Sequence, residues 1–110
     1  MPQITVDYSA PLDRRGFALT LHPLVAEATG APLSACATRF REVEETVVGD
    51  GATERAVVHV DIVVRFGRTD DDKRRLSKAV LALLPRHLKT AERARLSVEV
   101  RDFENSYLEG

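Results

Sequence analysis

Met1-Pro2-Gln3-Ile4-Thr5-Val6-Asp7-Tyr8, the opening stretch of the chain, combines a strand pattern with an imino acid at its head. Its apolar residues alternate with polar ones, which is the period-two pattern of a strand that buries one face. If Met1 is removed, Pro2 becomes the amino terminus, and its nitrogen becomes a secondary amine instead of an amide. The stretch therefore predicts a strand that carries a titratable base at its start.

A free Pro2 amine would suit proton-transfer chemistry. An α-amino group titrates near pH ~7.7 to 8.0, and a partly apolar, cationic environment lowers that pKa because it disfavours the charged form. A base with a pKa near neutrality can remove a proton next to a carbonyl group. Met-Pro is also a common way for a chain to begin, and an attached Met1 would leave the Pro2 nitrogen a tertiary amide with no basicity.

Two helices are predicted from apolar spacing. Over residues 13–29 apolar side chains recur every three or four positions, Gly30 gives a stop signal, and we expect Pro23 to bend or restart the helix. The second helix is expected to begin after Thr69, a capping residue followed by acids, and to kink at Pro85. The expected buried stripes are Phe17, Leu21, Leu24, Val25 and Ala28, then Leu76, Val80, Leu83, Leu84 and His87 or Leu88, with Lys73, Arg74, Arg75, Lys78 and Arg86 facing solvent.

Three further extended segments are expected. Residues 36–48 mix apolar and charged side chains, which favours an extended segment containing a loop, and Gly49-Asp50-Gly51 predicts a hairpin turn. Residues 56–66 are the part of the chain richest in β-branched side chains, which is typical of a central strand. Residues 96–100 alternate again and predict a last strand, after which Phe103 and Tyr107 could anchor the tail.

The order strand, helix, strand, turn, strand, helix, strand divides the chain into two β-α-β units. A crossover helix lets its flanking strands lie parallel in one sheet. We therefore expect one α+β domain over residues 1–110, with a four-stranded mixed sheet and both helices on one face. Such a sheet leaves its other face and its edges uncovered, so association through the sheet is expected.

Composition excludes several classes of function. Sixteen basic and seventeen acidic residues give a formal net charge of −1, so there is no overall electrostatic case for nucleic acid or a membrane surface, and low aromatic content argues against base stacking. Cys36 is the single cysteine, which suits a reducing compartment and excludes cysteine-based metal sites. No metal-binding spacing, phosphate loop or membrane-length apolar run is present, so a cytoplasmic protein is expected.

Three arginines lie at positions suited to binding an anion: Arg39 and Arg41 in the extended segment, and Arg68 before the second helix. A guanidinium binds a carboxylate through two hydrogen bonds and keeps its charge, so these residues could recognise a small dicarboxylate. Without further support, pairing with the neighbouring acids Glu42, Glu44, Glu45 or Asp70 to Asp72 on a solvated surface is the favoured interpretation. His59 in the central strand is expected to pack in the core or an interface rather than to act as a general acid.

Taken in order, several stretches resemble the tautomerase superfamily, and most closely the 5-carboxymethyl-2-hydroxymuconate isomerase family. They are Met1-Pro2 with its strand to Ser9, Ala28-Thr29-Gly30 with Pro32-Leu33, Thr38-Arg39, Val58-His59-Val60, and Gly67-Arg68-Thr69. The tail after residue 101 is shorter than the family's and keeps only Asn105 and Tyr107 as a loose similarity.

The resemblance implies a homotrimer with active sites at or near subunit boundaries, no metal or organic cofactor, and a small carboxylate substrate from aromatic-compound degradation. Pro2 would be the acid-base group, and Arg39 and Arg68 would bind and polarise the substrate, with Arg41 as a further candidate. The implied reaction is keto-enol isomerisation.

Two alternatives remain open from the sequence. The same scaffold could catalyse another reaction, such as dehalogenation by hydration or decarboxylation. The chain could also be a non-catalytic oligomeric protein that binds a small anion or a partner.

Overall fold

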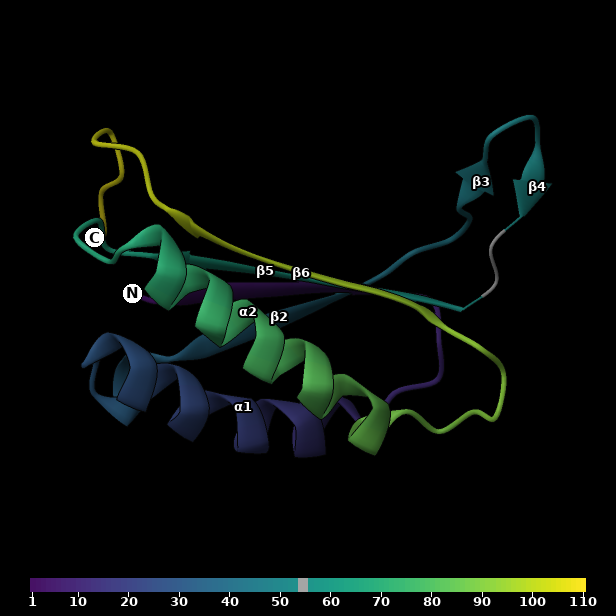
Figure 1. Ribbon diagram of the computed structural model, residues 1–110, viewed down its shortest axis with the longest axis horizontal. Helices are drawn as coiled ribbons and strands as arrows, with labels where there is room; N and C mark the ends of the chain where they lie inside the picture. Colours follow the sequence, from purple (N-terminus) through teal and green to yellow (C-terminus); the bar gives the residue numbers. More distant parts are fainter. Residues whose placement is uncertain (54–55) are drawn as a thin grey trace.

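The chain folds around one four-stranded sheet (Figure 1). The computed structural model describes residues 1–53 and 56–110. The strands are β1 (Gln3–Tyr8), β2 (Ala37–Glu42), β5 (Val57–Val64) and β6 (Arg95–Asp102), in the order β2-β1-β5-β6. The pairs β1–β2 and β5–β6 are parallel, and β1–β5 is antiparallel. Two β-α-β units forming a mixed sheet are therefore confirmed.

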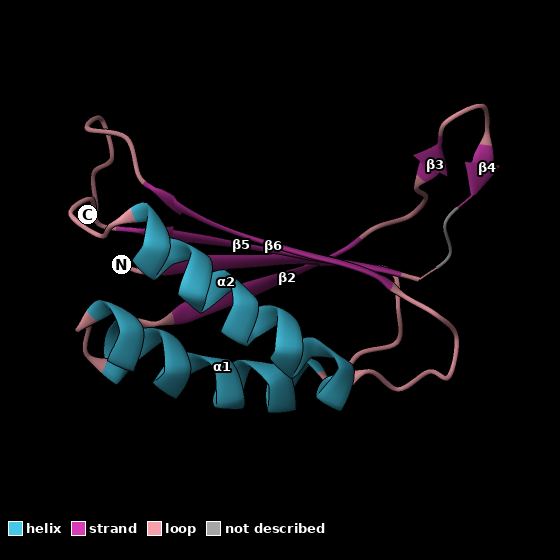
Figure 2. Cartoon of the chain, in the orientation of Figure 1, coloured by secondary structure: helices cyan, strands magenta, loops and turns pink. Residues whose placement is uncertain are grey.

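Two helices cover a single face of the sheet, as predicted (Figure 2). Helix α1 spans Arg14–Thr29 and α2 spans Asp70–Leu83, with short 3-10 turns η1 (Leu33–Ala35) and η2 (Leu84–His87). The covered face is apolar because alternate residues of β1 and β5 point toward the helices. The core contains Ile4, Val6, Val58, Val60, Ile62, Val64, Phe17, Leu21, Val25, Leu76, Val80, Leu83 and Leu84.

No helix of the described residues lies over the other face of the sheet (Figure 2), which carries polar side chains such as Gln3, Thr5 and Asp7 of β1. Ion pairs join neighbouring strands there: Asp7 of β1 with Arg41 of β2, and Asp61 of β5 with Arg101 of β6. His59 lies on the same face, where its Nδ1 is 2.6 Å from Ser97 Oγ, so it is not part of the helix-covered core.

Residues 47–53 form a small hairpin apart from the main sheet. Strands β3 (Val47–Val48) and β4 (Ala52–Thr53) pair with each other in a two-stranded sheet of their own, and the hairpin projects away from the helices (Figure 1). Its turn at Gly49-Asp50-Gly51 has positive φ at both glycines, a conformation that glycine adopts without steric cost. The predicted turn is confirmed, but it closes a separate ribbon instead of joining strands of the main sheet.

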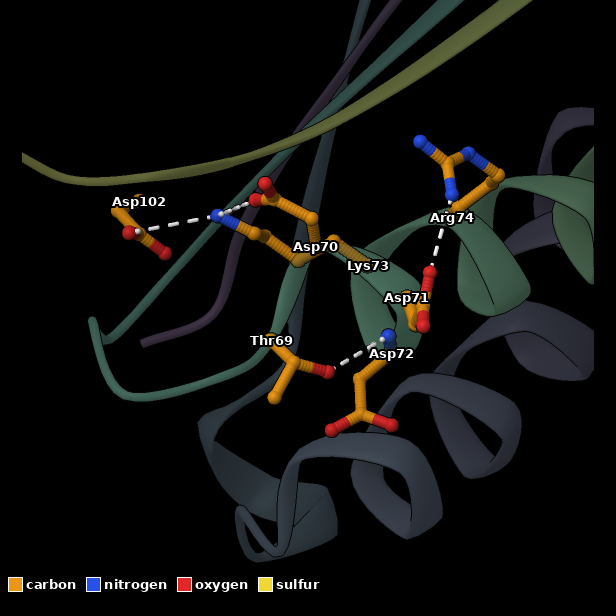
Figure 3. A network of polar contacts seen from close by, with 7 residues as sticks. All are labelled: Thr69, Asp70, Asp71, Asp72, Lys73, Arg74 and Asp102. Carbon is orange, nitrogen blue, oxygen red and sulfur yellow. Dashed lines mark hydrogen bonds and ion pairs between the residues drawn. The ribbon is translucent and has the colours of Figure 1, made fainter.

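Thr69 caps α2 as predicted, and a set of charges surrounds its first turn (Figure 3). The Thr69 hydroxyl accepts a hydrogen bond from the Asp72 amide at 3.0 Å. Lys73 was expected to face solvent, and this prediction is wrong, because its side chain is only 18% exposed. Its ammonium pairs with Asp102 at 3.4 Å and with Asp70 at 3.5 Å, which ties the start of α2 to the end of β6.

The remaining differences between the predicted and the observed structure concern the ends of the strands, the two prolines in the helical segments and the exposure of Ala28. Helix α1 continues through Pro23, which lies on its exposed side, without restarting. At Pro85 the α-helix gives way to the 3-10 turn η2. Ala28 is exposed instead of buried, β5 stops at Val64, and β6 is longer than expected. No helix in the described part of the chain is long and apolar enough to cross a membrane.

We expect Thr69→Ala to lower the free energy of unfolding by about 1 kcal/mol, because the amide of Asp72 loses its capping acceptor. Urea denaturation followed by circular dichroism measures this change. The control is Ser106→Ala, an exposed hydroxyl in the tail, which should have little effect. Equal stability of the two variants would contradict the role of the cap.

We expect His22 to make stability pH-dependent. Its Nε2 lies 2.8 Å from Thr38 Oγ1, and burial lowers the pKa of the imidazole. The folded state therefore favours the neutral ring, so the His22 contribution is complete above the ordinary pKa of 6.5 and is lost as pH falls below it. In urea denaturation at about pH 7.5 and about pH 5.5, His22→Gln should lose less stability on acidification than the natural chain. The same loss in both proteins would refute this assignment.

Candidate active site

A cavity of about 380 Å³ lies at the end of the sheet where β1 begins and β5 ends. The antiparallel pairing of these strands sets Gln3 opposite Val63, so the residues before β1 and those after β5 meet at the same edge. The carboxyl end of α1 and the chain's tail complete the walls. The lining residues are Met1, Pro2, Thr29, Gly30, Ala31, Pro32, Ala35, Val64, Arg65, Arg68 and Glu109.

Pro2 lies in the wall of this cavity and is fully buried. Its position follows from β1, which begins one residue later and is hydrogen-bonded on both sides. In the structure the Pro2 nitrogen is bonded to Met1, whose side chain is only 3% exposed. Removal of Met1 would convert this nitrogen into a secondary amine.

Arg68 brings a positive charge to the same cavity from the loop between β5 and α2. Its Nη2 donates a hydrogen bond to the carbonyl oxygen of Thr29, one of the last carbonyls of α1. Carbonyls at a helix carboxyl end lack partners within the helix and carry partial negative charge, so they are suitable acceptors for a guanidinium. Gly30 ends α1 with φ 74°, and a Cβ there would lie 3.8 Å from Arg68 Nη2.

Arg39 lies close to this end of the sheet but does not line the cavity. It pairs in register with Thr5, and its Nη1 donates to Gln3 Oε1 at 3.3 Å, on the face without helices. Arg39 is thus connected to the residue that follows Pro2.

Arg41 is held elsewhere. It binds the Asp7 carboxylate through two hydrogen bonds of 2.7 Å and 3.1 Å, and this contact raises the pKa of the guanidinium. Asp7 lies five residues along β1 from Pro2, a distance of roughly 16 Å at the usual strand rise. Of the three arginines predicted from the sequence, the structure therefore brings only Arg68 to the Pro2 cavity.

Two charged residues of the cavity were missed by the sequence reasoning: Arg65 and Glu109. Arg65 was visible as a basic residue at the end of the central strand run, three positions before Arg68. Glu109 gave no signal, because its position depends on how the tail folds back.

Aromatic contacts fold the tail over the site. The Phe103 ring lies 6.2 Å from that of Phe66, and the Tyr107 ring lies 5.0 Å from that of Phe103. The Tyr107 hydroxyl then donates to Glu109 Oε1 at 2.9 Å, and the same oxygen lies 3.4 Å from the Met1 ammonium. These contacts lower the pKa of the Glu109 carboxyl, the Tyr107 hydrogen bond most of all. The predicted aromatic anchors are present.

The histidines lie outside the cavity. His22 contacts Thr38, His59 contacts Ser97, and the His87 ring packs against Phe17 at 5.8 Å. Across residues 1–53 and 56–110, no three or more His, Cys, Asp or Glu side chains are grouped so that they could hold a metal ion. The cavity lining thus includes Pro2, two arginines and one glutamate.

The chain resembles several solved structures over nearly its full length. A 5-carboxymethyl-2-hydroxymuconate isomerase from Deinococcus radiodurans R1 matches with 21% identity and a TM-score of 0.78, covering 98% of this chain and 88% of its own. A 5-carboxymethyl-2-hydroxymuconate delta-isomerase matches with 13% identity and a TM-score of 0.79, covering 100% and 87%. A Q0 fused 4-OT symmetric trimer matches with 22% identity and a TM-score of 0.76, covering 97% and 89%.

At 13% to 22% identity, the similarity to these solved structures shows that the chain shares their fold. No curated protein matches the chain. The family model of 5-carboxymethyl-2-hydroxymuconate isomerase matches residues 2–109, which is almost the whole chain. The chain therefore belongs to the 5-carboxymethyl-2-hydroxymuconate isomerase family and is an isomerase with the tautomerase fold.

Proposed function

We propose that the chain catalyses keto-enol isomerisation of a small unsaturated keto acid, with Pro2 as the acid-base group once Met1 has been removed. The observation that carries the proposal is that Pro2 and Arg68 line one cavity of about 380 Å³. That volume lies within the usual range of small-molecule sites, roughly 300 to 1,000 Å³. Most of the remaining wall is apolar or backbone, so the two guanidinium groups would dominate the recognition of an anion.

The proposed reaction moves one proton along a conjugated system. The Pro2 amine takes the proton from the enol hydroxyl of the substrate, and the electron pair of that O–H bond forms the new carbonyl bond as the double bonds shift. The carbon at the far end of the system then takes a proton back from the Pro2 ammonium. Arg68 and Arg65 would hold the substrate's carboxylate and stabilise the charge of the enolate between the two transfers.

The substrate class follows from the cations and from the family. A guanidinium fits a carboxylate through paired hydrogen bonds, which favours an acidic substrate over a neutral one. The family is described by 5-carboxymethyl-2-hydroxymuconate, an unsaturated acid, and we propose a compound of that type, formed during degradation of an aromatic compound.

We propose further that the chain works as a homotrimer. The uncovered polar face and the open edges of β2 and β6 leave surface for neighbouring copies, and the fused 4-OT structure with this fold is a symmetric trimer. Arg39 would act at the cavity rim through its contact with Gln3. Arg41 would reach a ligand only in the cavity of another subunit, because Asp7 holds it far from Pro2 in its own.

We expect Pro2→Ala to reduce kcat/KM for a hydroxymuconate-type dienol by about 10²-fold to 10⁴-fold, the usual contribution of a positioned acid-base group. The assay follows loss of dienol absorbance, and intact mass first establishes that residue 2 is the amino terminus in both proteins. Circular dichroism should show an unchanged fold. Full turnover by Pro2→Ala would refute proline catalysis. If the natural chain turned over only substrates that lose halide or carbon dioxide, it would catalyse one of the alternative reactions instead.

We expect Arg68→Ala to raise KM for the same substrate about tenfold or more, because a charge-assisted hydrogen bond contributes about 1.5 to 3 kcal/mol. The matched control is Arg74→Ala, which removes an exposed guanidinium of α2 that is paired with Asp71. Its steady-state constants should stay close to those of the natural chain. The same KM change in both variants would show that Arg68 acts only through overall charge.

A further inference from the structure

Glu109 is the one acidic residue that lines the cavity within the described part of the chain. A carboxylate there is unexpected in a site for an acidic substrate, because it repels the ligand that Arg65 and Arg68 would attract. Its Oε1 lies 3.4 Å from the amino-terminal nitrogen. The residue therefore faces the amine as well as the ligand.

We propose that Glu109 is a positioning residue that stabilises the protonated form of the amino terminus and so sets the pH above which Pro2 can act as a base. The inference rests on the proposed role of Pro2. It also changes the expectation from the sequence, in which only cations and apolar groups surrounded the amine and its pKa was expected to be low.

The carboxylate lies close to the Pro2 nitrogen. The nitrogen of Pro2 follows that of Met1 by one residue, a span of at most about 3.6 Å, so it lies within about 7 Å of Glu109 Oε1 even before the tail moves. The Glu109 side chain is 52% exposed. An opposite charge within about 4 to 6 Å favours the charged form of a titrating group.

The tail keeps this carboxylate in place and ionised. The Phe103 ring contacts the Phe66 ring edge-on and the Tyr107 ring at a tilt, which holds the segment near the end of β5, and the Tyr107 hydroxyl donates to Glu109. The same contacts lower the pKa of the Glu109 carboxyl, so it carries its negative charge throughout the range in which an amine titrates.

In the part of the chain that the structure describes, the other groups near the amine are cationic or neutral. Arg65 and Arg68, from the loop after β5, oppose protonation of the amine. Burial raises the pKa of the Tyr107 phenol and of the Cys36 thiol, so both are neutral near pH 7. Arg39 reaches the region through Gln3 and adds a positive charge. Among the residues that the structure describes, Glu109 is thus the acidic group that lines the cavity and can offset these positive charges.

The test measures the pKa of the Pro2 amine without substrate. The sample is protein that begins at Pro2, as established by intact mass, and that carries proline labelled with nitrogen-15. Nitrogen NMR follows the Pro2 signal as the pH is changed. The other prolines are amides, so their signals do not titrate. In Glu109→Gln the Pro2 pKa should fall by about one pH unit. Tyr107→Phe keeps the ring contact but removes the hydroxyl donor, and it should shift the pKa in the same direction by less. The acidic limb of kcat/KM should move with each measured value.

The matched control is Glu104→Gln, which removes the same charge from the same tail at a position that does not line the cavity. Its Pro2 pKa should equal that of the natural chain. An unchanged pKa in Glu109→Gln, or an equal change in Glu104→Gln, would overturn the proposal. Neither result would contradict the catalytic role of Pro2, because that role is tested separately by the turnover of Pro2→Ala.

Discussion

The structure depends on β1 being hydrogen-bonded along both of its edges. It pairs in parallel with β2 and antiparallel with β5, and its residues Ile4 and Val6 are fully buried beneath the helices. A shift of one residue in this register would turn the buried side chains to the polar face, so the register is strongly specified. Because Pro2 directly precedes the strand, its position at the end of the sheet is specified with equal strength.

The antiparallel pairing at the centre of the sheet also explains why the two β-α-β units share one site. It places the start of the first unit beside the end of β5 in the second, so a residue at the beginning of the chain meets Arg65 and Arg68. The hydrogen bond from Arg68 to Thr29 then joins the loop before α2 to the end of α1. Each unit contributes one part of the cavity, and neither unit could form it alone.

Local patterns were enough to predict the elements and their order, because alternation, helical spacing, the Thr69 cap and the glycine turn each act over a few residues. The resemblance of the ordered stretches pointed to the family that the family model then showed. Features set by distant contacts were not predictable. Asp7 holds Arg41 only because the β1–β2 register sets them opposite each other, and Lys73 is drawn inward by Asp102, twenty-nine residues away. Glu109 reaches the cavity because the Phe103 ring of the tail contacts Phe66, which lies far back in the sequence.

The convergence of both chain ends on the cavity has a practical consequence for anyone who makes this protein. An affinity tag fused ahead of Met1 would extend from the nitrogen that pairs with Glu109 at 3.4 Å, and a tag after residue 110 would begin next to Glu109 itself. The tip of the β3–β4 ribbon offers a better insertion point. A Cβ at Gly49 or Gly51 would meet no atom within 4 Å, and exposed loop tips with small residues are where chains tolerate added sequence.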